Sequence, residues 1–519
     1  MEEETTSLAS IHLASVPPPE ETSSSFAEET PRLPSIQLAS SAPEKTSSRF
    51  EGLAAPYPPP LSYRESIRSV AWPEWRIRSA LSSQSGQSGS NYSSTSGASS
   101  SDLPNISAYS GGSASAGTVD FGAEELTKIA RRMISDGYTQ RMFQAFIHGG
   151  EQDGDLETWF AELDINWVFQ VRQKHGEVWQ YQLHDTSASG LQELAERWIR
   201  ALTIIVVSIK ELVATFHETP AVERFGKASI SAMLVFVDAI VNVSKVENLH
   251  TLLQMYICVS NASYDILTMR VISWDAQTRR QIGGLLERNG TRLICIISGT
   301  AKDLRLILAR NNDTWAIEIT GGGGEVHRNT GLLVNCIVSM RKAQYSARNS
   351  AQSYNERTLR SMIDDMITYL KNLLWKKSKL CPDPSLRYMF LLNNSYFAAA
   401  VCESKTEYEK HMHSYLEVSW GHVLSCISTS NSHGPLRHWI KVYSLAKFQS
   451  AFHKTYATQK FWKVPDPRLR SLLRETITKR VVSGYLDYLR EHPELEKQVS
   501  SGNNSPEVFE EMLGELFEG

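Results

Sequence analysis

Apolar residues recur at helical spacing from Asp120 to the end of the chain, and this periodicity constrains the fold more than any other feature. The first run covers 126–134 and stops before Gly137, a residue type that commonly terminates helices. Further runs cover 191–216, 230–241, 249–257, and 332 onward through 374. The signal is mixed at 293–297 and 315–319, where β-branched residues favour strands. Because helices and strands do not alternate, the sequence predicts an all-α stack of antiparallel helix pairs.

Residues 1–118 have a different composition, rich in Ser, Pro, Thr and Glu and poor in large aliphatic side chains. Such a segment buries too little apolar surface to offset the entropy of ordering it, so we predict a disordered tail at 1–118 and a helical region at 119–519. The segment 8–15 nearly repeats at 33–40, as either a local duplication or a doubled docking motif. The segment 63–78 contains two tryptophans and four arginines, and is either a linear interaction motif or inert.

Charge and composition exclude several classes of protein. The net charge is −4, and 1–118 carries 7 basic against 12 acidic residues, so the helical region is close to neutral and is not a globally basic nucleic-acid binder. Six cysteines without paired spacing indicate a reducing compartment. The acidic start at 1–4 is unlike a secretory signal, and the longest apolar runs, 201–208 and 233–241, are too short to span a bilayer. We therefore expect a cytoplasmic protein whose membrane contact is peripheral.

The sequence gives only weak support for three candidate sites: a phosphate-binding loop, a metal site and a catalytic nucleophile. Four glycines at 321–324 suggest a phosphate-binding loop, but Glu325 follows where such a loop needs Lys and Ser or Thr, so we expect a flexible loop before a helix. The cluster of His411, His413, His422, Cys426 and His433 contains one pair with ligand spacing, His422 and Cys426, and is more typical of a surface cluster. Four cysteines, Cys258, Cys295, Cys336 and Cys402, lie in apolar runs, and no serine sits in a nucleophile elbow. The sequence predicts neither an enzyme nor a metal or cofactor site, and an enzymatic alternative would depend on His422 or Cys426.

The carboxyl-terminal part, 441–519, is locally basic. Between 441 and 491 there are eleven Lys and Arg against four Asp and Glu. Asp466 and Pro467 predict a helix start there. The predicted buried stripe of this helix comprises Leu469, Leu472, Leu473, Ile477, Val481, Tyr485 and Tyr488. The segment 505–519 is expected to form an acidic amphipathic helix that closes the stack.

The basic excess is either an ordinary solvated face or a site for an anionic partner. Arg470 and Arg474 lie one turn apart on a face other than the buried stripe. Each basic residue near an anionic leaflet contributes about 1 kcal/mol, so five or six could hold the protein there reversibly.

Several segments together resemble the exocyst seventy-kilodalton subunit family of plants. The matching segments, in order, are 126–138, 191–202, 323–335, 390–396, 419–420, 447–452, 462–470 and 516–519. They include a glycine-rich loop, an apolar-Asn-Asn signature at Asn393 and Asn394, and Trp462-Lys463-Val464-Pro465-Asp466. Arg328 and Asn329 stand where the family usually has Pro-Leu.

The resemblance implies an elongated rod of stacked helical bundles in a non-enzymatic complex that tethers secretory vesicles at the plasma membrane. It also implies that the 441–519 subdomain binds phosphatidylinositol bisphosphate through basic side chains. The candidate lipid-binding residues are Lys460, Lys463, Arg468, Arg470, Arg474, Lys479 and Arg480. The implied partners are other exocyst subunits, anionic phosphoinositide membranes and small GTPases, but no nucleic acid.

Two departures from the family support an alternative. The family generally begins with a long coiled-coil segment that assembles with other subunits, whereas this sequence has the Ser/Pro-rich 1–118. Residues 499–504 replace the basic and aromatic residues that commonly precede the last helix. Both departures resemble a divergent grass-type branch, so the alternative function is a soluble immune scaffold or pathogen-effector target that works with immune receptors outside the exocyst.

Overall fold

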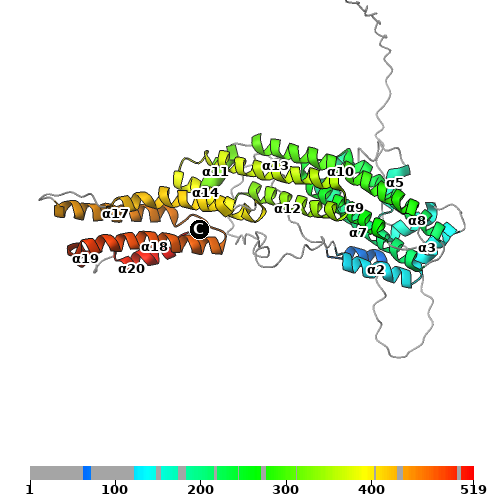
Figure 1. The fold of residues 1–519 in the computed structure, drawn as a ribbon, viewed down its shortest axis with the longest axis horizontal. Helices are drawn as coiled ribbons and strands as arrows, with labels where there is room; N and C mark the ends of the chain where they lie inside the picture. Colours follow the sequence, from blue (N-terminus) through cyan, green and yellow to red (C-terminus); the bar gives the residue numbers. More distant parts are fainter. Residues whose placement is uncertain are drawn as a thin grey trace, which may run out of the picture. The chain divides into compact units, whose positions relative to one another are not determined.

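Helices account for every regular element in the part of the chain that the structure describes (Figure 1). The computed structural model describes residues 62–71, 122–147, 153–173, 183–215, 219–243, 245–269, 276–310, 313–402, 405–428, 437–499 and 504–518. The all-α class predicted from the periodicity is therefore confirmed. The near-repeat at 8–15 and 33–40 and the residues His433 and Gly519 lie outside these ranges.

An aromatic core joins the first helices to α8 (Thr219–Val241). The helices in this part are α2 (Ala123–Ser135), α3 (Tyr138–Ile147), α4 (Asp153–Glu162) and α5 (Trp167–Gln173). The Phe146 ring meets Phe225 edge-on at 5.3 Å, and the Trp159 ring lies 4.9 Å from the same phenylalanine. As the periodicity predicts, α2 ends before Gly137, which adopts a φ of +70° that favours glycine.

Four helices beyond α7 (Ala188–Thr215) and α8 form two hairpins that pack side by side. The first hairpin is α9 (Leu249–Thr268), preceded by the short η3 (Val246–Asn248), with α10 (Ala276–Arg310). The second is α12 (Arg328–Asn349) with α13 (Ser353–Ser378). Ser346 donates to Asn261 at 2.7 Å, and Tyr369 donates to the carbonyl of Arg305 at 2.7 Å. These bonds tie α9 to α12 and α10 to α13, so the predicted helix pairs are present.

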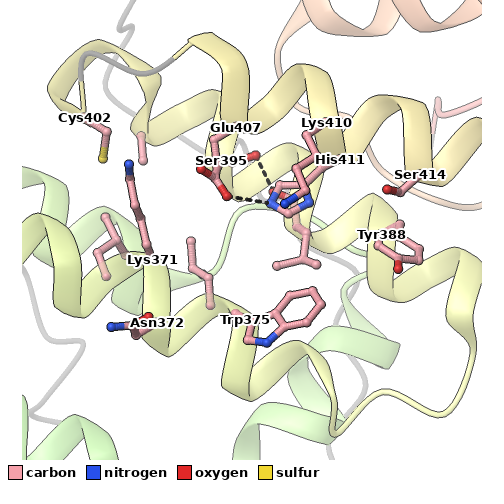
Figure 2. Close-up of a pocket in the computed structure, with 14 residues that line it drawn as sticks. Lys371, Asn372, Trp375, Tyr388, Ser395, Cys402, Glu407, Lys410, His411 and Ser414 are labelled. Carbon is pink, nitrogen blue, oxygen red and sulfur yellow. Dashed lines mark hydrogen bonds and ion pairs between the residues drawn. The ribbon is translucent and has the colours of Figure 1, made fainter.

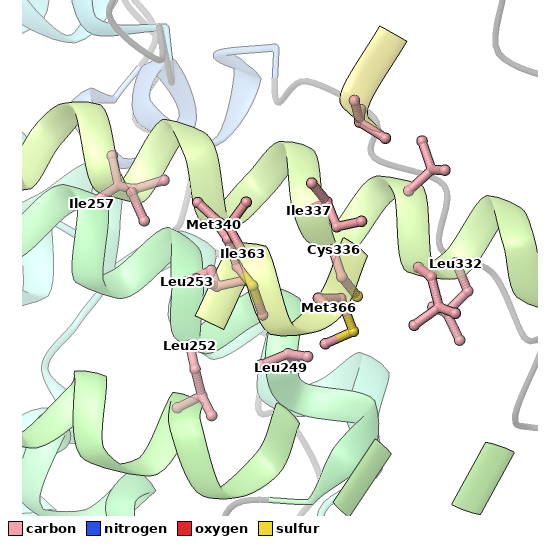
Figure 3. Packing of buried hydrophobic residues seen from close by; sticks show 14 of the residues in the cluster. Leu249, Leu252, Leu253, Ile257, Leu332, Cys336, Ile337, Met340, Ile363 and Met366 are labelled. Atoms are coloured by element: carbon pink, nitrogen blue, oxygen red, sulfur yellow. The ribbon is translucent and has the colours of Figure 1, made fainter. Parts of the chain in front are cut away.

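Helix α9 is buried on almost all sides because α7, α10 and α12 all pack against it. Figure 3 shows Leu253 of α9 next to Met340 of α12 and Ile363 of α13. A helix that is apolar around most of its circumference is stable only in such an interior position.

The two segments with strand-favouring residues are helical. Ile294 and Ile297 lie within α10, and Trp315 and Ile319 lie within α11 (Asp313–Gly321), with all four side chains buried. Their spacings of three and four place them on one helix face, so burial against neighbouring helices outweighs the local β preference.

His250 makes this core sensitive to acid. Burial lowers the pKa of His250 to about 4, with Lys342 adding to the shift. In the unfolded chain His250 binds a proton near pH 6.5, whereas in the folded state it stays neutral until about pH 4. The contribution of His250 to the free energy of unfolding is therefore complete above pH 6.5 and is lost as the pH falls toward 4. The free energy of unfolding should drop by about 2 kcal/mol between pH 7.5 and pH 5 from this group alone.

Denaturant titrations at the two pH values test this prediction. His250→Gln should show a smaller loss than the wild type by about 2 kcal/mol. His413→Gln, which changes an exposed histidine, should keep the full loss. Equal losses in the wild type and His250→Gln would contradict the prediction.

The remaining helices follow one another to the carboxyl end. They are α14 (Pro384–Cys402), α15 (Lys405–Leu416), the π-helical η4 (Glu417–Gly421), α16 (His422–Ser425), α17 (Arg437–Gln459), α18 (Pro467–Glu491), α19 (Pro493–Val499) and α20 (Pro506–Gly514). The predicted terminal helix is shorter than 505–519: α20 ends at Gly514, and Phe517 beyond it takes a φ of +67°. Among the described residues, no helix has the length and apolar character needed to cross a bilayer.

Part of the predicted disordered tail is ordered and packed on the helical body, which corrects the prediction for these residues. Tyr63–Ser69 forms α1, and Ile67 is 1% exposed. Arg68 makes two hydrogen bonds of 2.6 and 2.7 Å to the buried carboxylate of Asp164. The sequence allows 63–78 to be either a binding motif or an inert stretch; its first half binds the chain's own helices, and 72–78 lie outside the described residues.

Candidate functional site

The basic helix α18 begins as the sequence predicts. The Asp466 carboxylate accepts hydrogen bonds from the backbone N–H groups of Arg468 and Leu469 at 2.9 and 3.0 Å, and Pro467 occupies the first turn. The predicted buried stripe is confirmed with one correction, because Leu472 is 40% exposed. Leu473, which also belongs to the predicted stripe, is buried in that turn.

Three of the predicted lipid-binding arginines lie on α18 and form ion pairs. Arg474 lies 2.6 Å from Glu518 and also donates to the Leu516 carbonyl, while Arg470 lies 3.9 Å from the same carboxylate. Arg480 pairs with Glu417 of η4, on a different face of the helix. The arginines lower the pKa of both carboxyl groups, with Arg474 the main cause at Glu518 and Arg480 at Glu417.

The other four predicted residues are distributed more widely. Lys463 lies 3.8 Å from Glu325, and the Lys460 ammonium lies 4.8 Å from the centre of the Phe461 ring. Arg468 and Lys479 are exposed on α18. The structure therefore places all seven residues in the terminal subdomain but divides them between several helix faces.

Three distant sequence segments meet where the chain enters this subdomain. Asn393 of α14 donates to the carbonyls of Gly324 and Lys463 at 2.7 and 2.9 Å, and the Lys463 N–H donates to Gly323 at 3.1 Å. Gly323 and Gly324 adopt φ values of +59° and +78°, and both lie against neighbouring chain. The four glycines are therefore a packed turn at the end of α11, which corrects the expectation of a flexible loop.

The adjacent asparagine completes this junction. Asn394 accepts from the His327 N–H at 2.9 Å and from the Thr330 hydroxyl at 2.6 Å. It donates to the carbonyls of Phe390 and Glu325. His327 stacks on Trp315 with ring centres 3.6 Å apart, and burial lowers its pKa to about 3. These buried groups hold the glycine turn against α14 in one geometry, which is a structural role.

A second basic surface lies on α17; the sequence reasoning counted its lysines in the basic subdomain but did not single out this helix face. The segment 437–465 contains six Lys and Arg and no Asp or Glu. We define the outer face of α17 as Trp439, Tyr443, Lys447, Ser450, Lys454 and the following Phe461, all of which are exposed. The three aromatic residues are 73%, 69% and 68% exposed, which is unusual for rings of this size. A search of 437–465 for acidic residues could have found this surface from the sequence.

The histidine-rich segment forms no metal centre in the described part of the chain. Among these residues, no group of three or more His, Cys, Asp or Glu side chains is placed to hold an ion. The Cys426 thiol donates to the His422 carbonyl at 3.3 Å, which is a bond within one helix.

The helix hairpins, together with the junction around Asn393 and Asn394, define an all-helical bundle protein. Comparison with known sequences identifies its family. The sequence model for the C-terminal region of Exo70, a subunit of the exocyst complex, matches residues 210–515, more than half of the 519 residues. The chain belongs to this family, as the resemblance predicted.

Curated relatives come from Arabidopsis thaliana. Exocyst complex component EXO70A1 is 26% identical over 333 residues, covering 56% of this chain and 50% of that protein. EXO70B2 is 21% identical over 408 residues, covering 72% and 64%, and EXO70A3 is 26% identical over 231 residues, covering 38% of each. The chain thus spans between 38% and 64% of the length of these three relatives.

Proposed function

We propose that the protein is a non-enzymatic component of the exocyst that tethers vesicles at the plasma membrane, where its terminal subdomain contacts phosphoinositides. Membership of the family supports the tethering role, because the relatives are named as exocyst complex components. The observation that carries the membrane contact is the outer face of α17, where exposed aromatic and basic side chains share one face of an acid-free helix.

The chemistry of this face fits an anionic lipid surface. Lys447 and Lys454 form no ion pair with any described residue, so their charge is available to a partner. Each such lysine contributes about 1 kcal/mol near an anionic leaflet. Trp439 and Tyr443 are amphipathic rings, the type enriched at the interface between membrane and water.

We expect the predicted arginines of α18 to contribute to lipid binding as well, but less than the lysines of α17. Arg470 and Arg474 are already close to Glu518, so part of their charge is balanced before any lipid arrives. Glu518 is 65% exposed, and exposed ion pairs are worth at most about 1 kcal/mol. A phosphate group can therefore displace the carboxylate at modest cost.

Sedimentation with vesicles tests the membrane contact. The wild type should bind vesicles containing phosphatidylinositol bisphosphate, and binding should fall as salt rises. Lys447→Gln with Lys454→Gln removes about 2 kcal/mol and should weaken binding about 30-fold. Arg470→Gln with Arg474→Gln should weaken binding only a few-fold. Wild-type binding by the Lys447 and Lys454 variant would contradict the role of α17, provided that circular dichroism shows both variants folded.

Affinity purification from plant cells tests the assembly. Recovery of other exocyst subunits supports the tethering role. Recovery of immune receptors without those subunits would overturn it in favour of the immune scaffold.

A further inference from the structure

A cavity of about 390 Å³ lies between α13, α14 and α15, away from the surfaces described above (Figure 2). Its apolar wall consists of buried side chains from α13 and α14, namely Leu370, Leu374, Leu391 and Ala398. Trp375 lines it as well and is 48% exposed, so the cavity opens to solvent. This volume and lining are typical of sites for small organic ligands.

The polar lining is concentrated on α13 and α15. Lys371 comes from α13, and Glu407, Lys410 and His411 come from α15 (Figure 2). Burial lowers the pKa of His411, so the ring is neutral at pH 7. Two ammonium groups against one carboxylate leave the lining with one positive charge.

His411 lies on the polar side of the cavity. The residue is 8% exposed and lines the cavity. Its ring makes no hydrogen bond to any residue that the structure describes, and the nearest carboxylate oxygen, on Glu407, is 3.8 Å away. A neutral imidazole keeps one N–H donor, so the ring can donate a hydrogen bond to a group that enters the cavity.

We propose that this cavity binds a small organic monoanion with an apolar body, of the aromatic carboxylate class. The carboxylate balances the single positive charge of the lining and accepts a hydrogen bond from His411. The apolar body covers the leucine wall beside Trp375. This proposal is independent of the membrane contact.

Ligand-observed NMR on the full chain tests the proposal with 1-naphthoate and its neutral analogue 1-naphthamide. We expect naphthoate to bind and naphthamide to bind at least about tenfold more weakly. Lys371→Met, which keeps the aliphatic stem, should raise the Kd for naphthoate about tenfold. Lys376→Met is the matched control, because Lys376 is exposed on the same helix and does not line the cavity.

A cavity-filling variant localises the ligand. Ala398→Met should abolish naphthoate binding because the larger side chain fills the cavity. If this variant does not fold, Lys371→Met still tests whether naphthoate binds in the cavity. Three outcomes would each overturn the proposal. The first is no naphthoate binding at about 1 mM, which is the result expected for a cavity that holds water alone. The others are equal binding of naphthamide and naphthoate, and an unchanged Kd for naphthoate in Lys371→Met. Vesicle binding should be unaffected by Lys371→Met, which separates this test from that of the proposed function.

Discussion

Replacing Asn394 by leucine should lower the free energy of unfolding by about 4 kcal/mol. Asn394 is fully buried and makes four hydrogen bonds, two as acceptor and two as donor. Leucine has the same branching as asparagine but is larger and has no polar atoms, so it leaves the His327 N–H, the Thr330 hydroxyl and the Glu325 carbonyl without this partner. The His327 and Thr330 groups are buried, and each buried group left unpaired costs about 1–3 kcal/mol, so these two account for the expected loss.

Thermal unfolding followed by circular dichroism measures this effect. At about 2–4 °C per kcal/mol, the unfolding midpoint should fall by about 10 °C. The matched control is Ser395→Ala, because Ser395 follows on the same helix and its hydroxyl bonds within that helix. The control should cost less than about 1 kcal/mol. A midpoint near the wild-type value for Asn394→Leu would show that the junction does not hold the glycine turn against α14.

Replacing Asp164 by alanine should release α1 from the helical body. The Asp164 carboxylate is 7% exposed and makes two hydrogen bonds to Arg68. Arg64 and Arg197 lie within 3.7 and 3.6 Å of it. Arg68 is 52% exposed, so water partly replaces the two lost bonds. We expect a loss of about 2 kcal/mol, and the released population should rise about 30-fold.

Limited trypsin digestion reports the release, because Arg64 and Arg68 are cleavage sites within α1. Cleavage at these arginines should accelerate in Asp164→Ala by a similar factor, since proteolysis follows the population of the open form. Asp136→Ala is the control: it removes the single bond from the Tyr63 hydroxyl, and Asp136 is exposed. That variant should cleave no more than about tenfold faster. Wild-type cleavage rates in Asp164→Ala would show that the apolar contacts of Ile67 and Val70 hold α1 alone.

Ordering of α1 shows where a compositional argument fails. The segment 1–118 has few aliphatic residues on average, and that average predicts disorder. Tyr63–Ser69 nevertheless folds because its few apolar and basic groups meet matching partners more than 90 residues away, on Ala161 and Asp164. Such a contact is invisible to any local measure.

The prediction of lipid-binding residues was also limited by contacts between residues that are far apart in the chain. Counting charges located the basic subdomain, and the Asp466 cap located the start of α18. Counting could not show that Glu518 and Glu417 approach the arginines of α18, because these carboxylates are 44 and 63 residues away from their partners in the chain.

The sequence by itself determined the helical class, most helix positions and the family, because these depend on patterns within one or two turns or on the order of short segments. The tertiary structure alone decided which charges remain available, how the glycine turn is held, and where a cavity remains between three helices. These properties depend on side chains from different helices coming within a few ångströms of each other, and local spacing does not determine those distances.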